Sequence, residues 1–406
     1  MAFGPTLSSL RRHKTAVLLI VLQIAVACAI LCNAVFLIGQ RVDRMNQASG
    51  IDDSRLVMIE SMGLDPDKKT STRVAEDLAV LRNVSGVESA ISVGQFPYVS
   101  NSWNTSLSLK ENQQKPTLTT NMVTVDPGFL KTSGLKLLQG RWFSTEEHQP
   151  EEVLFGGGEI RFPMLVITQD LAERLFPGES ALGKIVFGMG DGGSRVVGIT
   201  SNMLAPGGQA GGDSATQYMS VFVPVTSNMS WYVLRTEPDQ RESVLKQAVA
   251  SLNRTDPNRI INGQRTLTEM RQSYYSRDRA VTWLLVIVSV LLLTITAFGI
   301  GGLASFWVQQ RTKQIGVRRA LGATRKQILH YFQIENFIIV TGGVVLGMLL
   351  AYGINQLLMG KYELPRLPWF YLPIGASALW LLGQIAVLWP ALRAASIPPA
   401  TATRSV

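Results

Sequence analysis

The 406-residue sequence has few of the side chains that most often bind metals or act as nucleophiles. Its only two cysteines, Cys28 and Cys32, lie inside a long apolar run, which excludes a disulfide framework outside a membrane and a zinc site built from cysteine alone. The three histidines, His13, His148 and His330, are scattered and form no H-E-x-x-H pattern. A G-x-S-x-G motif is also missing, so the sequence supports neither a metalloenzyme nor a serine hydrolase.

Charged residues are scarce as well. They make up 17% of the chain, against about 25% in a typical soluble domain, while 46% of the residues are hydrophobic. This balance argues against a wholly soluble protein, and the apolar content argues against disorder. The net charge of +9 would suit a nucleic-acid partner, but the cations crowd beside apolar runs, which is typical of a protein embedded in membrane lipid. No nucleic-acid partner is therefore predicted.

Four runs are apolar and long enough to cross a bilayer as helices. A hydrocarbon core about 30 Å thick needs roughly 20 apolar residues in helical form. The first run is too long for a cleaved signal peptide, and no small-residue cleavage site follows before Arg41, so we interpret it as a retained helix. The predicted transmembrane helices cover residues 15–40, 280–308, 331–359 and 370–392.

Lysine and arginine are concentrated in segments that would meet at one face of the membrane. Because short loops rich in these residues stay in the cytoplasm, residues 1–14, 309–330 and 393–406 are predicted to lie there. Residues 41–279 and the short loop 360–369 then lie outside. The cations concerned are Arg11, Arg12, Lys14, Arg311, Lys313, Arg318, Arg319, Arg325, Lys326, Arg393 and Arg404.

The large outer segment opens with a strand–helix–strand pattern. Residues 56–59 and 87–93 have the composition of buried strands, and apolar residues recur at helical spacing over 74–81 between them. The segment therefore does not have the character of a linker.

The end of the outer segment repeats this pattern. Strand-like runs at 231–235 and 260–261 flank an amphipathic helix, which Asp239 and Glu242 would start as a D-x-x-E capping box. The two ends indicate halves of one α/β subdomain with other material inserted between them.

The predicted fold is thus a four-helix membrane protein with an extracytoplasmic α+β domain between its first and second helices. One part of that domain is discontinuous, at about 41–127 and 216–265, and an insert at about 128–215 mixes strands with glycine-rich turns. The helical pattern of 267–279 runs into the second span without a breaker. It predicts one continuous helix able to carry motion through the membrane.

One stretch of the insert comes close to a nucleotide-binding loop. Residues 178–185 nearly match G-x-x-x-x-G-K-[ST], but Ile185 stands where the motif needs a hydroxyl for magnesium. The stretch also lies in the outer segment, where ATP is scarce. We interpret it as a surface turn and expect no ATP-hydrolysing site in this chain.

The third span contains one acidic residue and a run of small residues. We expect Glu335, near the inner end, to reach lipid headgroups or Arg325 and Lys326, although an ionisable residue in a span is also a candidate functional group. The small residues have a small-x-x-x-small spacing that lets another helix approach closely, within the chain or in a second copy. They are Gly342, Gly343, Gly347 and Ala351.

The segment 310–323 between the second and third spans is the most informative one. Its cations alone would be explained by the positive-inside rule. However, apolar residues are interspersed with them, and Gly316 and Gly322 bracket a short helix, which suits a helix that docks into a groove on another protein. The apolar residues are Ile315, Val317, Ala320 and Leu321.

These residues carry a resemblance to a known family. Residues 315–323, followed by Thr-Arg-Lys-Gln-Ile-Leu and by Phe-Gln-Ile-Glu at 332–335, resemble the signature of MacB/FtsX-type ABC transporter permeases. The ending Trp-Pro-Ala-Leu-Arg-Ala-Ala-Ser-Ile-Pro-Pro at 389–399 is similar to the ending of that family. The stretches 125–143, 172–184 and 195–199 resemble its MacB-like periplasmic core domain.

The resemblance implies a permease dimer, formed with a second copy or a paralogue, that engages two cytoplasmic ATP-binding subunits. It implies a bacterial inner-membrane location and a periplasmic domain with porter-like (41–127 and 216–265) and Sabre-like (128–215) parts. ATP and magnesium would be bound by the partner, with no cofactor in this chain. The implied coupling residues are Gln314, Ile315, Gly316, Val317, Arg318, Arg319, Ala320, Leu321, Gly322 and Ala323.

Two departures from the family pattern affect the expected partner. MacB proper carries a fused N-terminal ATPase, whereas about 14 residues precede the first span here, so the ATPase is expected to be a separate chain. Gln314 stands where family members often have glutamate. Reversing the charges of Arg318 and Arg319 is expected to uncouple ATP hydrolysis.

The resemblance leaves three functions open. In all three, ATP-driven closure of the partner moves the outer domains without substrate passing between the membrane helices, a process called mechanotransmission. The first is efflux of peptides, antibiotics or other periplasmic compounds through an adaptor and an outer-membrane channel, and the outer domain favours it. The others are lipoprotein extraction and signalling to a periplasmic partner without transport.

Overall fold

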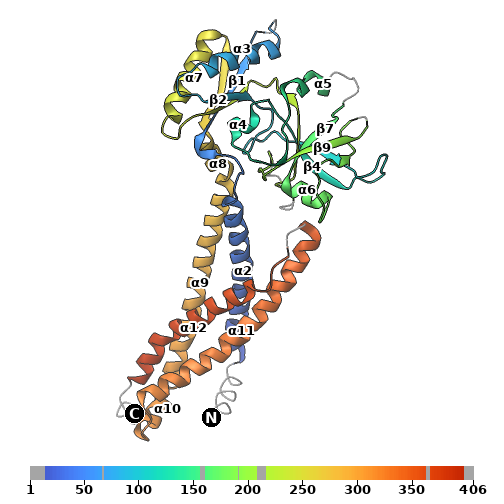
Figure 1. The fold of residues 1–406 in the computed structure, drawn as a ribbon. Helices are drawn as coiled ribbons and strands as arrows, with labels where there is room; N and C mark the ends of the chain where they lie inside the picture. The colour runs from blue at the N-terminus through green and yellow to red at the C-terminus, as the bar shows by residue number, and fades with distance from the viewer. Residues whose placement is uncertain are drawn as a thin grey trace. The chain divides into compact units, whose positions relative to one another are not determined.

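The computed structural model describes residues 14–65, 68–155, 161–190, 192–207, 216–362 and 366–396 (Figure 1). By their length and composition, four helices in these ranges could cross a membrane. The chain divides into two compact units, residues 47–276 and the remainder. The four long helices are α2 (Lys14–Met45), α9 (Ser276–Gln310), α11 (Arg325–Tyr362) and α12 (Tyr371–Ala395), close to the predicted spans.

Helices α2 and α11 cross in close contact and run in the same chain direction. A Cβ atom added to Gly343 would lie 2.7 Å from the Ile24 Cβ, and one added to Gly347 would lie 2.4 Å from the Cys28 Cβ, so only glycine fits at either position. Ala351 is fully buried further along the same face. Gly342, by contrast, faces open space. Gly343, Gly347 and Ala351 therefore serve packing within one chain.

Polar contacts fix which helix ends lie together in the membrane unit. At the end remote from Lys14, Arg41 Nη1 lies 2.5 Å from Asp278 Oδ1 and joins the end of α2 to the start of α9. At the opposite end, Arg319 Nη1 donates to the carbonyl of Ala395 at 3.1 Å. The connection between α9 and α11 thus lies beside the end of α12, as the distribution of cations predicted. Arg11, Arg12 and Arg404 lie outside the described residues.

The first sheet of the 47–276 unit is antiparallel with strand order β13-β1-β12-β2. Two helices, α3 and α7, cover one of its faces with an apolar core that includes Ile59, Leu78 and Tyr232. This confirms the two strand–helix–strand halves. The predicted capping box is wrong, because α7 begins after Gln240 and no side chain caps it. The elements are β1 (Leu56–Gly63), α3 (Thr70–Arg82), β2 (Ser89–Ser92), β12 (Trp231–Arg235), α7 (Arg241–Thr255) and β13 (Arg259–Thr266).

A buried charged cluster ties α3 to this sheet. Arg259 of β13 donates to both carboxylate oxygens of Asp77 at 2.8 Å, and the side chains of this pair are each 1% exposed. Tyr232 of β12 donates its hydroxyl to Asp77 Oδ2 at 2.6 Å. Burial, and then the Asp77 carboxylate, raise the pKa of Tyr232 well above its ordinary value, so the tyrosine stays a neutral donor.

The second sheet has the order β3-β4-β10-β7-β9-β5, with β8 paired to β9. Its strands β3 and β4 precede the predicted insert at 128–215 and β10 follows it, so the inserted structure is larger than predicted. The cause is the parallel pairing of Ser220–Val223 with residues 121–124, which joins segments far apart in the sequence. The strands are β3 (Trp103–Leu107), β4 (Leu118–Thr124), β5 (Leu137–Gly140), β7 (Met164–Thr168), β8 (Ile185–Val186), β9 (Ser194–Thr200) and β10 (Ser220–Val223).

Short elements complete the 47–276 unit. The stretch 178–185 that approaches the nucleotide-binding motif is an exposed turn between α6 and β8, as predicted, and its Lys184 pairs with Glu179 at 2.6 Å. A small parallel pair joins β6 to β11. The short elements are η1 (Asp53–Arg55), α4 (Phe129–Ser133), η2 (Thr145–Glu147), β6 (Gln149–Pro150), α5 (Glu152–Phe155), α6 (Gln169–Leu175) and β11 (Val225–Thr226).

The helix predicted to be continuous over 267–279 is interrupted. Helix α8 (Leu267–Tyr274) starts at a capping box in which Thr266 Oγ1 accepts from the Glu269 amide at 3.2 Å. It ends before Tyr275, which is buried, and α9 begins at Ser276. The ring of Tyr275 packs at right angles to Tyr274, 4.9 Å between centroids, and both rings contact Tyr98. Tertiary packing of aromatic rings thus accompanies a break that the local sequence does not show.

Candidate functional site

The connection between α9 and α11 contains a short helix, α10 (Thr312–Ala320). Gly316 lies in its middle and not at its start, contrary to the prediction. It ends in a Schellman motif, in which the Gly322 amide bonds to the Arg319 carbonyl at 3.1 Å and the Ala323 amide to the Arg318 carbonyl at 3.0 Å. Gly322 has φ +96°, a backbone conformation that glycine adopts without strain.

The next helix begins immediately afterwards. The Thr324 amide donates to Gln327 Oε1 at 2.9 Å, and the Gln327 amide donates to Thr324 Oγ1 at 3.3 Å, which is a capping box at the start of α11. A helix stop and a helix start therefore follow within four residues. This local chemistry fixes the corner between α10 and α11.

One face of α10 is anchored to its own chain. Ile315 is buried among apolar side chains of the membrane unit that include Ile328 and Phe332 of α11 and Ala394 of α12. Gly316 is buried beside it. Arg319, which bonds to the Ala395 carbonyl, joins the same face to the end of α12. A force applied to α10 therefore reaches α11 and α12 directly.

The opposite face of α10 is exposed and partly apolar. Lys313, Val317 and Leu321 are spaced four residues apart and so form one stripe along the helix. Val317 is 46% exposed and Leu321 is 83% exposed, and no large hydrophobic side chain among the described residues is more exposed than Leu321. Ala320 is exposed next to this stripe. Val317 and Leu321 together form an exposed apolar stripe outside the four spans, which makes this face a candidate docking surface.

A third face of α10 forms one side of a pocket. Gln314, Arg318 and Ala323 line a cavity of about 100 Å³ together with Gln327 and Tyr331 of α11. The guanidinium of Arg318 lies 5.2 Å from the centroid of the Tyr331 ring, in a cation–π arrangement. The predicted coupling residues 314–323 therefore have different positions. Some are on the buried face of α10, some form the exposed stripe and some line this pocket, and Gly322 ends the helix.

Glu335 is not at the surface. It is 1% exposed, and its two carboxylate oxygens lie 2.8 and 3.1 Å from Arg311 Nη1. The expectation that it reaches headgroups, Arg325 or Lys326 is wrong, because the turn between α9 and α10 brings Arg311 against it. Arg311 also lies 5.6 Å from the Trp307 ring.

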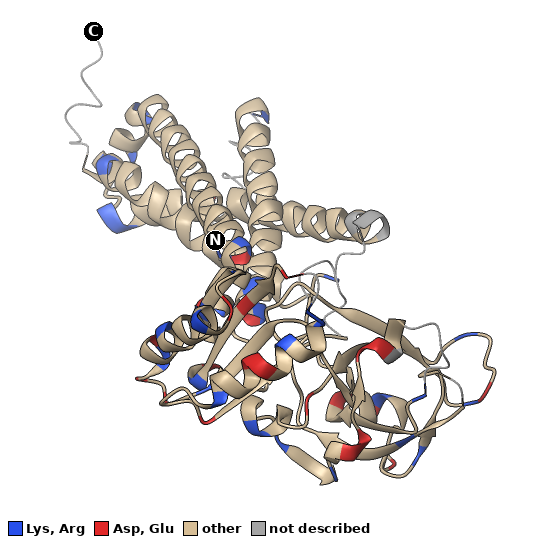
Figure 2. Cartoon of the chain, turned by 90° about the horizontal axis from the view of Figure 1, so that it is seen from above, with Lys and Arg blue, Asp and Glu red and all other residues tan. Residues whose placement is uncertain are grey.

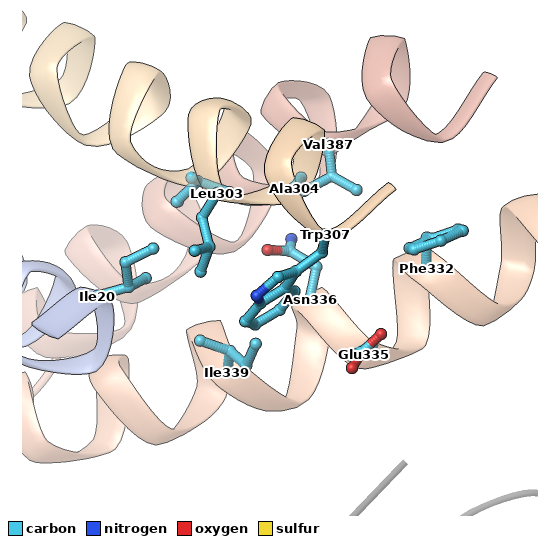
Figure 3. A pocket seen from close by; sticks show the side chains of 10 residues that line it. Ile20, Leu303, Ala304, Trp307, Phe332, Glu335, Asn336, Ile339 and Val387 are labelled. Carbon is cyan, nitrogen blue, oxygen red and sulfur yellow. The ribbon is translucent and has the colours of Figure 1, made fainter. Parts of the chain in front are cut away.

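A small cavity adjoins Glu335. Figure 3 shows Trp307 extending toward Asn336 and Ile339 of α11, with Glu335 beside them. The cavity volume is about 20 Å³, enough for a water molecule but not for a substrate. Asn336 donates to the Gly383 carbonyl of α12 at 2.9 Å. Glu335 of α11 thus holds Arg311, the residue that follows α9, and Asn336 of α11 bonds to α12.

Comparison with protein-family models shows the family to which the chain belongs. Residues 15–252 match the family model of the MacB-like periplasmic core domain, which covers more than half of the sequence. Residues 286–399 match the model of the FtsX-like permease C-terminal region, which contains α10. The chain is an ABC transporter permease of the MacB and FtsX type. Among the described residues of this permease, no group of three or more His, Cys, Asp or Glu side chains could hold a metal ion.

Curated relatives of this permease extend over most of its length. It is 23% identical to the uncharacterized ABC transporter permease YknZ of Bacillus subtilis, over 98% of this chain and 97% of the relative. It is 25% identical to the macrolide export ATP-binding/permease protein MacB of Acinetobacter baylyi, over 99% of this chain and 59% of the relative. The crystal structure of the periplasmic region of MacB from Actinobacillus actinomycetemcomitans is similar at a TM-score of 0.35 and 16% identity, over 57% of this chain and 97% of that one. This permease thus spans little more than half the length of the MacB protein of Acinetobacter baylyi.

Proposed function

We propose that this permease transmits conformational change from a separate cytoplasmic ABC ATP-binding subunit to the 47–276 unit on the other side of the membrane. ATP and magnesium are bound by the partner, and this chain supplies the mechanical link. The observation that carries the proposal is the exposed Val317–Leu321 stripe on a helix whose other face is anchored to α11 and α12.

The character of α10 supports an ATPase partner. A short helix with an apolar stripe fits into a hydrophobic groove on another protein. Lys313, which lies in the stripe itself, favours a groove with an acidic rim, because complementary charge steers association. The anchor of Ile315 and Arg319 means that movement of the docked helix also moves α11 and α12.

We further propose that the working unit is a dimer with a second copy or a paralogue of this chain in a bacterial inner membrane. The motion serves efflux of peptides, antibiotics or other periplasmic compounds, with an adaptor and an outer-membrane channel as further partners. Support comes from the names of relatives, since the MacB proteins are named for macrolide export.

Replacing Leu321 with aspartate tests the docking stripe. The substitution should abolish stimulation of the partner's ATPase by the permease, because loss of a central apolar anchor weakens a protein interface by about 2 kcal/mol or more. Folding should be unaffected, because the side chain is 83% exposed. The measurement is ATP hydrolysis by the reconstituted complex.

The matched control is Gln310→Asp, which adds the same charge at an exposed position off the stripe. It should retain stimulation. Full stimulation by Leu321→Asp would contradict the assignment. Arg318 and Arg319 are less suitable for this test than the sequence indicated, because Arg318 lines the pocket against Tyr331 and reversal of Arg319 would also break the bond to Ala395.

A further inference from the structure

The inner end of the membrane unit has a large excess of positive charge. The sequence has no Asp or Glu before Asp43, none between Asp278 and Glu335, and none after Glu363. The described cations at this end are Lys14, Arg311, Lys313, Arg318, Arg319, Arg325, Lys326 and Arg393. Figure 2 shows basic positions gathered at one end of the long helices. Glu335, the acidic residue of α11 that lies at this end, pairs with Arg311.

Within this basic region, the pocket between α10 and α11 is a formed site. Its polar lining comes from both helices and the turn before them: Gln314 and Arg318 on α10, Gln327 and Tyr331 on α11, and Arg311, which is paired with Glu335. Its floor contains Ile328 and Phe332, which are buried. A polar, cationic rim above an apolar floor suits an amphiphile with an anionic head.

Arg318 is the cation best placed to bind such a head. Its guanidinium is positioned over the Tyr331 ring, and no hydrogen bond or ion pair joins it to another described residue. A guanidinium offers five N–H donors in a planar fork that matches phosphate oxygens. Stacking on tyrosine orients this fork before any ligand arrives.

We propose that this pocket binds the phosphodiester headgroup of an anionic phospholipid from the inner leaflet. Arg318 contacts the phosphate, the Gln314 and Gln327 amides bond to it or to the adjoining glycerol, and the apolar floor receives the start of an acyl chain. The proposal rests on the cytoplasmic orientation of α10 in the proposed function. It does not rest on ATPase docking, because Val317 and Leu321 form a different face of α10 and stay free when the pocket is filled.

The test uses the full-length permease without its ATPase, in phosphatidylcholine nanodiscs with and without phosphatidylglycerol. Native mass spectrometry after extraction counts the phosphatidylglycerol that stays bound. Wild type should retain one molecule in this pocket, and Arg318→Gln should weaken retention about tenfold or more, because a charge-assisted hydrogen bond is lost. Arg318 is exposed, so the variant should fold.

Arg325→Gln is the matched control, because it removes the same charge at an exposed position that does not line the pocket. It should retain the lipid. Equal losses in the two variants would overturn the proposal in favour of diffuse attraction to the membrane. Displacement of the lipid by soluble glycerol phosphate would overturn it in favour of a free phosphate site, and displacement by the ATPase would assign the pocket to an acidic side chain of that partner.

The two proposals can fail separately. In nanodiscs of phosphatidylcholine alone, Leu321→Asp should fail to stimulate the ATPase, and stimulation by Arg318→Gln shows whether Arg318 also contacts that partner. If Arg318→Gln loses the bound lipid but still stimulates the ATPase, the result supports the lipid site. If Arg318→Gln keeps the bound lipid but no longer stimulates the ATPase, Arg318 belongs to the docking surface instead.

Discussion

Replacing Asp77 with asparagine should destabilise the 47–276 unit by about 3–5 kcal/mol, because it removes the carboxylate that pairs closely with the buried Arg259 guanidinium and leaves it a longer contact of 3.9 Å to the Asp256 carboxylate. The side chains of both residues are 1% exposed, so water cannot take the place of the lost carboxylate. Tyr232 also loses a charged acceptor. Since these residues come from α3, β12 and β13, the whole first sheet should loosen.

Hydrogen exchange on the full-length protein measures this effect. Amides of β1 and β13 should exchange faster in Asp77→Asn by roughly two to four powers of ten. Glu76→Gln is the matched control, since Glu76 is a neighbouring exposed carboxylate on α3 that pairs with Lys68 at the surface. A surface pair contributes about 0–1 kcal/mol. Similar exchange in both variants would show that the Asp77 cluster has no special role in stability.

Replacing Glu335 with alanine should have an effect of similar size on the membrane unit. Arg311 is held in a mostly buried position, with its side chain 14% exposed, and Glu335 forms an ion pair with it at 2.8 Å. Removing one partner of a buried pair costs about 3–5 kcal/mol. Because Arg311 is the residue between α9 and α10, loss of the pair should also free the start of α10.

A double replacement separates the charge from the packing. In Arg311→Met/Glu335→Leu both charges are gone, and burial of an apolar pair in their place is often neutral or stabilising. Thermal unfolding in detergent should therefore show a large loss of stability for Glu335→Ala and a recovery for the double variant. If Glu335→Ala lowers the stability by less than about 1 kcal/mol, as expected for an exposed pair, the result would contradict a stabilising buried ion pair.

The sequence was sufficient to predict the features that depend on local composition. The predicted spans 280–308 and 331–359 correspond to Ser276–Gln310 and Arg325–Tyr362, because hydrophobic length is visible in the sequence. The halves of the first sheet were also predictable, since each has its own periodicity. Family motifs then placed α10 correctly between the second and third spans.

Features that depend on distant contacts were not predictable. The limits of the second sheet follow from the pairing of β10 with β4. The sequence of neither strand shows which strand it pairs with. Glu335 was assigned to nearby Arg325 and Lys326, whereas its partner, Arg311, lies 24 residues away and reaches it through a turn. The interruption at Tyr275 accompanies contacts of the tyrosine rings with Tyr98, which is far away in the sequence.

The faces of α10 show the same limit within one site. Composition identified Ile315, Val317 and Leu321 as apolar residues of a docking helix. Only the packing of α11 and α12 reveals that Ile315 is an internal anchor while Val317 and Leu321 are exposed. A single-sequence argument can find such a helix, but it cannot assign its faces.

The central claim is that α10 and the 47–276 unit are in different aqueous compartments and are linked through the bilayer. Single cysteines at two exposed positions, Glu146→Cys and Lys313→Cys, test it directly, with the buried Cys28 and Cys32 as a silent background. A membrane-impermeant maleimide should label Glu146→Cys only in right-side-out vesicles and Lys313→Cys only in inverted ones. Labelling of both positions in the same vesicle orientation would contradict the account.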